Sequence, residues 1–323
     1  MAELAAELSA RLSSSGLDPA SVVRVVRAGL AEDLGDGPDV TTAATIAPGQ
    51  LGTANVVARA AGVVAGLFVA DAVFQLAGAD IGSADRVQRA AALNVRSGLP
   101  SDPSRGSLVT SHHQSTDGDV IGPGQVLMTV SGPLDVILTA ERTALNFLCH
   151  MSGIATLTRQ WVDAVAGTGA RIRDTRKTLP GLRALEKYAV RCGGGVNHRM
   201  SLSDAALIKD NHVAGAGSVT AAFDAVGKLA PDLAVEVECD TLEQVAEAVA
   251  AGAGLILLDN FSVADIAEAV RRTAGLARLE ASGGLRLEDA AAVAATGVDY
   301  LAVGALTHSA PALDIGLDLV PAG

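Results

Sequence analysis

Four strand-like runs in the C-terminal half decide the fold: AVEVE (234–238), LILL (255–258), ARLEA (277–281) and YLAV (300–303). Each run has the length and residue types of a β-strand. The residues that close the runs fall 21, 23 and 22 positions apart; they are Glu238, Asp259, Ser282 and Gly304. A regular interval of this size is typical of repeated strand–helix units.

Helices are expected beside these runs, near residues 218–229, 241–251, 263–274 and 287–295, and a further strand at 205–209. Thr241, with Gln244 three residues later, fits a capping box and predicts that a helix begins there. Right-handed strand–helix repetition closes into a parallel barrel. An open doubly wound sheet is the alternative, although no G-x-G-x-x-G pattern follows the first strand to favour a dinucleotide fold.

The N-terminal half predicts a less regular α+β arrangement. Helical spacing occurs at 3–12, 20–34, 71–77 and 134–166, and strand-like runs occur at 55–59 and 63–68. Residues 97–118 are polar, with two prolines and six serines, and predict a surface loop or insertion without a catalytic role. The pair His112-His113 could bind a metal, but we interpret it as the tip of this solvated loop.

Composition and charge exclude several classes of protein. Apolar residues make up 49% of the chain and aromatic residues only 2%, so Ala, Val and Leu must fill a closely packed α/β core. The net charge of −12 argues against a nucleic-acid-binding protein, which needs a basic surface. Residues 171–212 nevertheless hold nine lysines and arginines against four acidic residues, which predicts a pocket for a compact, highly charged anion.

Cysteine usage and hydropathy indicate a soluble cytoplasmic protein. The three cysteines, Cys149, Cys192 and Cys239, form no C-x-x-C pair, so neither a disulfide framework nor a zinc site is expected. Charged residues interrupt the first twelve positions, as they do not in a signal peptide. No apolar stretch approaches the ~20 residues of a membrane helix.

Polar residues stand where the predicted barrel strands end, and side chains at those C-terminal ends face the mouth of a β/α barrel. The early strands bring the basic segment 171–177 and Lys209, and the later strands bring carboxylates and glycines. Arginine binds carboxylate or phosphate with two parallel bonds, and glycine lets backbone N–H groups approach phosphate. Such a ring suits a sugar phosphate with a divalent metal. Alternation places Glu236 and Glu238 on the same side of their strand, one of them as an interior carboxylate or a structural partner. Asp259-Asn260 could instead cap a helix.

Several ordered motifs resemble the signature of quinolinate phosphoribosyltransferases. They are DTRKT (174–178), GGGxNHR (193–199), IKDNH (208–212), EVE (236–238), LDN (258–260), EASGG (280–284) and VGALTHS (303–309), with EDLGDG (32–37), TT (41–42) and ERTALN (141–146) upstream. The likeness covers nearly the whole chain and departs from the family mainly at 97–118, which is longer than usual.

The resemblance implies an α/β fold with two domains. The first is an open α/β sandwich of residues 1–140, joined by 309–323, and the second is an incomplete parallel α/β barrel of about seven strands, residues 141–308. It also implies a homodimer in which Arg142 reaches into the neighbour's site. The expected substrates are quinolinate and phosphoribosyl pyrophosphate, with Mg²⁺ and with neither nucleic acid nor membrane as partner.

The same resemblance assigns roles to individual residues. Arg142, Arg176, His198 and Arg199 would hold the carboxylates of quinolinate, and together they supply more cationic capacity than one carboxylate requires. Catalytic roles fall to Lys177, Lys209, Glu238 and Asp259, the last two facing the ribose and its magnesium. The rest of the substrate-binding set is Thr175, Ser282, Gly283, Gly284, Gly304, Ala305 and His308.

The implied reaction transfers phosphoribosyl to quinolinate with loss of carbon dioxide, giving nicotinate mononucleotide and pyrophosphate in NAD biosynthesis. Three alternatives remain open. One is a sibling phosphoribosyltransferase acting on another ring. Another is a Schiff-base aldolase with Lys209 as its amine. The third is a non-catalytic sensor of phosphoribosyl metabolites.

Overall fold

The computed structural model describes residues 4–47, 49–82 and 109–321. These residues form two compact units. The N-terminal unit extends to Thr156 and also includes the chain from Pro311 onward. The C-terminal unit is Leu157–Ala310. The division follows the density of contacts. The domain limits of 1–140 with 309–323, and of 141–308, stay a prediction.

A four-stranded antiparallel sheet is the frame of the N-terminal unit. Its strands follow the order β12-β1-β5-β3 and are β12 (Ile315–Leu319), β1 (Leu51–Ala58), β5 (Val126–Pro133) and β3 (Thr110–His113). A separate antiparallel pair consists of β2 (Gly62–Val63) and β4 (Val120–Ile121). Because β12 pairs with β1, the end of the chain returns to the first unit, as the resemblance implied.

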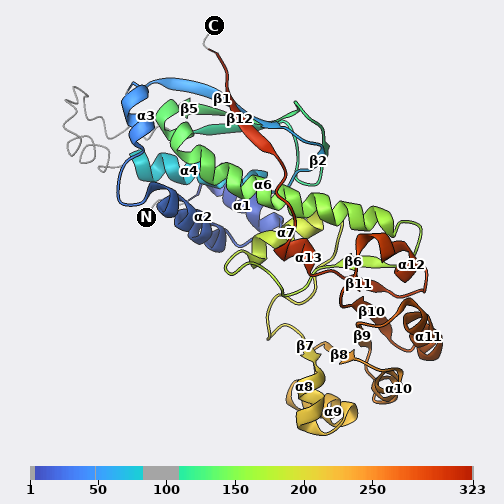
Figure 1. Ribbon diagram of the computed structural model, residues 1–323. Coiled ribbons are helices and arrows are strands. Elements are labelled where there is room, and N and C mark those ends of the chain that lie inside the picture. The colour runs from blue at the N-terminus through green and yellow to red at the C-terminus, as the bar shows by residue number, and fades with distance from the viewer. Residues whose placement is uncertain (1–3, 48, 83–108, 322–323) are drawn as a thin grey trace. The chain divides into compact units, whose positions relative to one another are not determined.

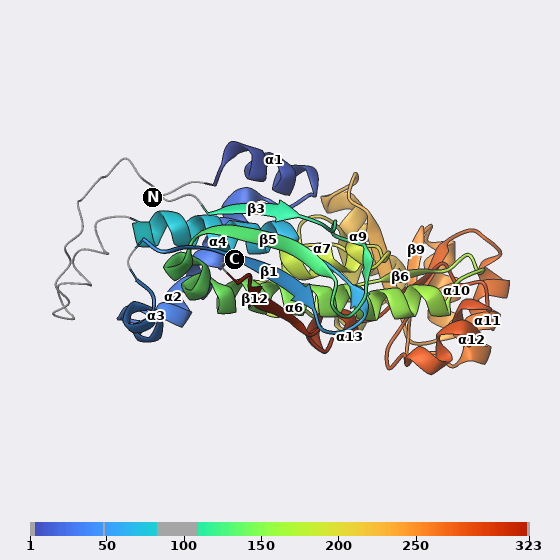
Figure 2. The same ribbon diagram turned by 90° about the horizontal axis from the view of Figure 1, so that it is seen from above.

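Helices pack beside this sheet, as Figures 1 and 2 show. They are α1 (Ala6–Ser14), α2 (Pro19–Leu34), α3 (Val40–Thr45), α4 (Leu67–Gly82) and the long α6 (Leu134–Ala164). Asp18 caps α2 by accepting a hydrogen bond from the amide of Ser21 at 3.0 Å. A Cβ on Gly153 of α6 would lie 2.1 Å from the carbonyl oxygen of Pro311, so the segment that leads into β12 requires glycine there.

Two predictions for this unit were wrong. Residues 63–68 form no strand beyond β2, and α4 already begins at Leu67, because a short apolar run without alternation does not separate strand from helix. Residues 97–108 lie outside the described residues, but 110–113, expected in a solvated loop, form β3. His113 is not a loop tip: its side chain is 15% exposed, and its Nε2 lies 3.7 Å from Oδ2 of Asp71.

A buried hydrogen bond ties β3 to α4. Ser111 Oγ donates to Asp71 Oδ1 at 2.7 Å. We expect Ser111→Ala to lower the free energy of unfolding by about 1–2 kcal/mol, because the Asp71 carboxyl group loses one of its hydrogen-bond partners. Urea denaturation measures this change. Thr110→Ala is the matched control, since that hydroxyl makes only an exposed bond of 3.3 Å; equal losses would show that the bond to Asp71 does not stabilise the unit.

Six parallel strands form the sheet of the C-terminal unit, in the order β6-β11-β10-β9-β8-β7. They are β6 (Arg171–Arg173), β7 (Ala206–Ile208), β8 (Val235–Cys239), β9 (Leu255–Asp259), β10 (Arg278–Ser282) and β11 (Tyr300–Ala302). The helices are α7 (Arg183–Cys192), α8 (Asp210–Ala216), α9 (Val219–Leu229), α10 (Leu242–Ala250), α11 (Val263–Thr273), the 3₁₀ turn η1 (Leu287–Asp289), α12 (Ala290–Ala294) and α13 (Ala305–His308). The predicted capping box is confirmed at Thr241 and Gln244.

The strand order is that of a barrel. β6 comes first along the chain but lies beside β11, the last, and a sheet whose first and last strands are neighbours must wrap around. The barrel is incomplete, with β6 and β7 at the two ends of the order. Beyond its six strands, Val196 adds one isolated parallel bridge to Arg173. A doubly wound sheet reverses its order at a switch point, so that alternative was wrong.

Candidate active site

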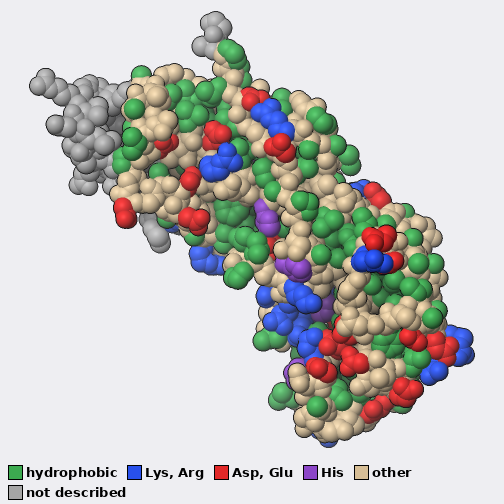
Figure 3. All heavy atoms as spheres, viewed as in Figure 1, with side chains coloured by type: hydrophobic (Ala, Val, Ile, Leu, Met, Phe, Trp, Pro, Cys, Tyr) green, Lys and Arg blue, Asp and Glu red, His purple; other side chains and the backbone are tan. Residues whose placement is uncertain are grey.

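The predicted site residues of the C-terminal unit lie at one edge of its sheet. Lys209 directly follows β7, Glu238 lies near the end of β8, and Asp259 and Ser282 close β9 and β10. Gly304 follows β11, and residues 174–177 follow β6. Because the strands are parallel, these ends share the mouth of the barrel. On the face drawn in Figure 3, Lys and Arg side chains of this unit gather beside a group of Asp and Glu side chains.

Gly304 brings the ends of β6 and β11 together. A Cβ on Gly304 would come within 3.2 Å of Lys177 Cδ, 3.3 Å of His308 Nε2 and 3.5 Å of Thr175 Oγ1. Thr307 Oγ1, on α13, donates to the carbonyl oxygen of Lys177 at 2.7 Å. The structure therefore brings Gly304, Lys177, His308 and Thr175 together. Gly304 directly precedes α13, which begins at Ala305.

Gly283 joins the ends of β9 and β10. It has a φ of 87°, and a Cβ would lie 2.3 Å from Asn260 Oδ1 and 2.8 Å from the Asn260 amide nitrogen, so no other residue fits. Gly284 also has a positive φ, of 58°. The following helix, α11, is capped by Ser262. The alternative role of Asp259-Asn260 as a helix cap was therefore wrong.

Lys209 and Glu238 form an ion pair across β7 and β8. The distance from Nζ to Oε2 is 2.5 Å, and the side chains are 46% and 12% exposed. Asp259 Oδ2 accepts a hydrogen bond from Asn260 Nδ2 at 2.8 Å. A Schiff-base lysine is desolvated in an apolar pocket or placed beside another cation, whereas Lys209 faces a carboxylate. The geometry gives no support to the aldolase alternative.

Arg176 and Arg199 are partly buried arginines whose positive charges repel each other. In both Arg176 and Arg199, Nε is buried and has no hydrogen-bond partner among the described residues. Burial lowers the pKa of Arg199, and the positive charge of Arg176 lowers that pKa further. Nη1 of Arg199 donates to the carbonyl oxygen of Ala205 at 2.7 Å, which fixes the guanidinium. Such a pair is stabilised by an anion with more than one carboxylate.

Both ring nitrogens of His198 make contacts within the protein. Its Nδ1 accepts a hydrogen bond from the Arg199 amide at 2.7 Å, and its Nε2 lies 2.8 Å from Glu236 Oε2. The residue is 7% exposed. A ring nitrogen that accepts a hydrogen bond carries no proton. The assignment of His198 to a carboxylate of quinolinate stays a prediction.

A buried cluster beneath these residues was not predicted as part of the site. Arg173 Nη1 lies 2.5 Å from Glu280 Oε2 and 4.0 Å from Glu236 Oε1. Asp174 and Lys187 form a second buried ion pair; Asp174 accepts from the His198 amide at 2.8 Å, and Lys187 donates to the His198 carbonyl oxygen at 3.0 Å. The signals in the sequence were the alternation that placed Glu236 on the same side as Glu238, the basic segment 171–177, and the motifs that contain Asp174 and Glu280.

Two carboxylates lie beside one guanidinium in this cluster. Burial raises the pKa of Glu280 to about 8, the charge of Glu236 raises it further, and Arg173 opposes both effects. Because this pKa is raised, the stabilising effect of the proton is complete below the pKa of an unfolded glutamate. That effect is lost as the pH rises towards about 8.

Glu280→Gln should therefore flatten the dependence of stability on pH. Glutamine mimics the protonated carboxyl group, so we expect the variant to be more stable than the parent above about pH 8 by a few kcal/mol at most. Thermal unfolding between about pH 5 and 9 measures this. The control is Glu268→Gln, at a partly exposed carboxylate whose pKa is already lowered to about 2 by Arg271 and Arg272. A variant that keeps the parent's slope would place the proton elsewhere.

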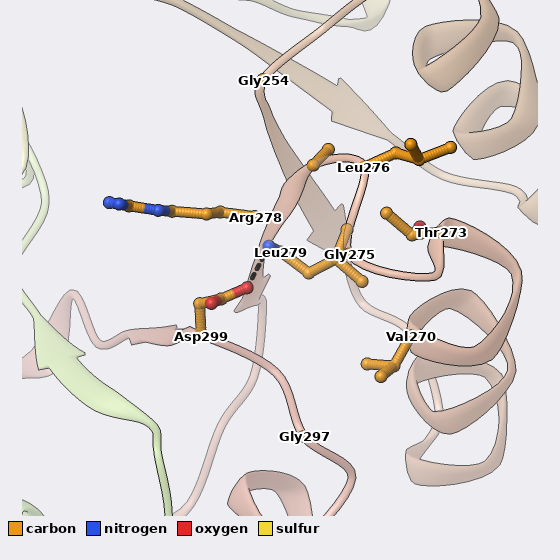
Figure 4. Close-up of a pocket in the computed structure, with 10 residues that line it drawn as sticks. Gly254, Val270, Thr273, Gly275, Leu276, Arg278, Leu279, Gly297 and Asp299 are labelled. Atoms are coloured by element: carbon orange, nitrogen blue, oxygen red, sulfur yellow. Dashed lines mark hydrogen bonds between the residues drawn. The ribbon is translucent and has the colours of Figure 1, made fainter.

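The cavities of this unit open at the opposite ends of the strands. One of about 310 Å³ lies between α11 and the starts of β10 and β11, where Asp299 Oδ2 accepts from the Leu279 amide at 2.8 Å (Figure 4). A second, of about 750 Å³, is lined by Arg199, His198 and Glu236 together with Arg173, Arg278 and Tyr300. Neither cavity contains Lys209, Glu238 or Asp259, but the second reaches one of the predicted quinolinate-binding arginines.

Arg142 stands apart from the other predicted residues. It is exposed on α6 within the N-terminal unit, whereas the others belong to the C-terminal unit.

Across residues 4–47, 49–82 and 109–321, none of the helices has both the length and the apolar character to span a membrane.

The chain matches known proteins along most of its length. Residues 154–318 match the family described as quinolinate phosphoribosyl transferase, C-terminal domain, and residues 106–152 match the N-terminal domain of that enzyme. A nicotinate-nucleotide pyrophosphorylase (carboxylating) of Mycobacterium leprae is 52% identical over 301 residues, which cover 91% of this chain and 95% of that protein. A probable enzyme of the same name from Synechocystis is 40% identical and covers 90% of each chain.

Solved structures agree with the sequence matches. NadC from Streptococcus pyogenes aligns with a TM-score of 0.80 at 37% identity, covering 94% of this chain and 99% of that one. The nicotinate-nucleotide pyrophosphorylase from Francisella tularensis aligns with a TM-score of 0.78 at 34% identity, covering 93% and 96%. The chain therefore belongs to the quinolinate phosphoribosyltransferase family.

Proposed function

We propose that this protein transfers the phosphoribosyl group of phosphoribosyl pyrophosphate to quinolinate with loss of carbon dioxide. The products are nicotinate mononucleotide and pyrophosphate, which places the enzyme in NAD biosynthesis. Two relatives that are 52% and 40% identical to this chain are named for this activity. The matches cover 95% and 90% of their lengths.

The observation that carries the proposal is the arginine pair. Arg176 and Arg199 are half-buried, repel each other, and each keep a buried Nε without a hydrogen-bond partner among the described residues. A monocarboxylate would leave one guanidinium unneutralised, and a buried unpaired charge is costly. A planar dicarboxylate such as quinolinate would neutralise both guanidinium groups. Nicotinate would neutralise only one, so the arginine pair favours quinolinate over nicotinate as the substrate.

The chemistry follows from the layout of charges at the strand ends. Lys177 and Lys209 stabilise the departing pyrophosphate, and Glu238 and Asp259 stabilise the positive charge that develops on the ribose. The pyridine nitrogen of quinolinate then forms a bond to the anomeric carbon as the bond to pyrophosphate breaks. The positive ring nitrogen then stabilises the electron pair left on the adjacent ring carbon when its carboxylate leaves as carbon dioxide, and that carbon takes up a proton from water. Positioning supplies the acceleration, and no side chain acts as a nucleophile.

The 5′-phosphate is held by the glycine segments. Gly283 and Gly284 have positive φ angles, and Gly304 has no side chain to block its backbone, so phosphate oxygens can approach the chain closely. Ser282, Ala305 and His308 flank this cradle. His308 is exposed, and its Nδ1 lies 2.7 Å from Ser309 Oγ.

The donors at the site fit a magnesium ion bound through the substrate. Mg²⁺ is held in enzymes by one or two carboxylates together with substrate oxygens and water. Glu238 and Asp259 supply two such carboxylates at neighbouring strand ends, although Glu238 Oε2 is paired with Lys209. When bound, the ion would neutralise charge on the pyrophosphate leaving group.

The proposal includes a homodimer in the cytoplasm. Arg142 belongs to a different unit from the remaining quinolinate-binding residues, and we propose that it completes the site of a second copy. Among the described residues, none of Cys149, Cys192 and Cys239 forms a disulfide, which suits a reducing compartment.

The substrate choice tests this function. The purified protein should form nicotinate mononucleotide from quinolinate, phosphoribosyl pyrophosphate and Mg²⁺, and should lose this activity when Mg²⁺ is chelated. With nicotinate in place of quinolinate, turnover should be very poor, because the second carboxylate is missing. Efficient use of nicotinate would favour a sibling transferase, and binding of quinolinate without consumption would favour a sensor.

A further inference from the structure

Three hydrogen bonds and one close contact with a carboxylate hold His198 in one position. Its backbone amide and carbonyl are engaged by the buried Asp174–Lys187 pair. On the ring, Nδ1 accepts from the Arg199 amide and Nε2 faces Glu236. The ring nitrogens are therefore both used within the protein, so His198 cannot bind a substrate carboxylate without giving up one of these bonds.

Charge balance allows two arrangements of the buried cluster of Arg173, Glu236, Glu280 and His198. Either both glutamates are ionised and His198 is positive, or one glutamate is protonated and His198 is neutral. Both arrangements have no net charge, so electrostatic balance alone does not choose between them. The bond of 2.7 Å from the Arg199 amide to Nδ1 does choose, because it exists only when that nitrogen carries no proton.

We propose that Glu236 is a positioning residue for quinolinate binding, which accepts the Nε2 proton of a neutral His198 and so leaves Nδ1 to fix the backbone of Arg199. The direction of the Arg199 side chain beside Arg176 is then set from inside the barrel. His198 acts through Arg199 and does not contribute charge. The inference rests on the proposed function only in naming quinolinate as the ligand whose affinity depends on Arg199.

The surroundings of Glu236 support this role. Glu236 is 4% exposed on β8, and its Oε1 has no hydrogen-bond partner in the described part of the chain. Glu280 Oε1, from β10, lies 3.8 Å from His198 Nε2, too far to replace Glu236 as acceptor. Arg173, from β6, points to Glu280 and stacks over the ring of Tyr300 at 5.0 Å. Among the described residues of this cluster, Glu236 is therefore the carboxylate close enough to accept a hydrogen bond from His198 Nε2.

The cluster also offers three possible metal ligands, His198, Glu236 and Glu280, whose ligand atoms lie within 4.8 Å of one another. Arg173 already provides the positive charge there, at 2.5 Å from Glu280. A divalent cation would have to displace this guanidinium, so the geometry favours a hydrogen-bonded support over a metal site.

Two substitutions separate the acceptor of Glu236 from its charge. Glu236→Gln keeps an oxygen that can accept from Nε2, so KM for quinolinate should stay within about three-fold of the parent. Glu236→Leu removes the acceptor and should raise that KM about ten-fold, with KM for phosphoribosyl pyrophosphate unchanged. Glu268→Gln, at a partly exposed carboxylate on α11, is the control for loss of a charge elsewhere.

Nitrogen NMR of the imidazole rings gives a readout that does not depend on activity. In ¹⁵N-histidine-labelled protein, which has six histidines, the His198 signals are identified by comparison with His198→Asn. We expect an unprotonated Nδ1 and a protonated Nε2 at neutral pH in the parent and in Glu236→Gln, and loss of this single form in Glu236→Leu.

An imidazolium signal from His198 in the parent would overturn the inference, and so would equal damage by Gln and Leu or an unchanged KM in Glu236→Leu. If the parent does not consume quinolinate, the proposed function fails while the NMR measurement still decides the state of His198. If Glu236→Leu does not fold, Glu236→Gln and the parent spectrum decide between the two arrangements.

Discussion

Arg199→Ala should lower kcat/KM for quinolinate by ~30-fold to several thousand-fold. The substitution removes one charge-assisted partner of a substrate carboxylate, and such a partner is worth roughly 2–5 kcal/mol when buried. It also leaves Arg176 as the only guanidinium of the pair. The loss should be much larger for quinolinate than for nicotinate, because nicotinate has no second carboxylate to lose. Steady-state kinetics with both acids measure the two effects.

Arg271→Ala is the control for that experiment. Arg271 is an exposed arginine on α11, paired with Glu268, and its removal should leave kcat/KM unchanged. Equal losses for the two acids in Arg199→Ala would contradict the assignment of Arg199 to the second carboxylate. They would favour a sibling transferase that acts on a ring with a single acid group.

Mixing two inactive variants should restore activity if Arg142 acts across a dimer interface. Arg142→Ala and Lys209→Ala homodimers should each be nearly inactive. A mixed dimer would then contain one site with both residues intact, so random subunit exchange should return about a quarter of the parent's activity. Exchange is verified by mass spectrometry of differently tagged subunits. Absence of recovery despite exchange would place Arg142 in the site of its own subunit.

The barrel could be predicted because its signal is local. Each run from 234 to 304 has strand composition, and the intervals of 21 to 23 residues repeat the same unit, so β8 to β11 were found nearly at their final bounds.

β3 could not be found from composition and spacing. Its sequence, TSHH, is polar, and it becomes a strand because β5 offers unpaired backbone groups and Asp71 accepts from Ser111. Tertiary pairing overrides composition there.

The mouth of the site was predictable for a similar reason, since strand ends in a parallel barrel converge whatever the details of packing. The neutral state of His198 was not predictable. It depends on a hydrogen bond of 2.7 Å and a contact of 2.8 Å, the second to a residue 38 positions away on β8. A sequence shows that a histidine stands next to an arginine, but not which ring nitrogen carries the proton.

We expect one site to join phosphoribosyl transfer to decarboxylation. Quinolinate labelled in the carboxylate next to the ring nitrogen allows carbon dioxide and pyrophosphate to be measured together. We predict one labelled carbon dioxide for each pyrophosphate, and neither product when phosphoribosyl pyrophosphate is omitted. Pyrophosphate released without labelled carbon dioxide, or a nucleotide product that keeps both carboxylates, would show that the two steps are not joined in this site.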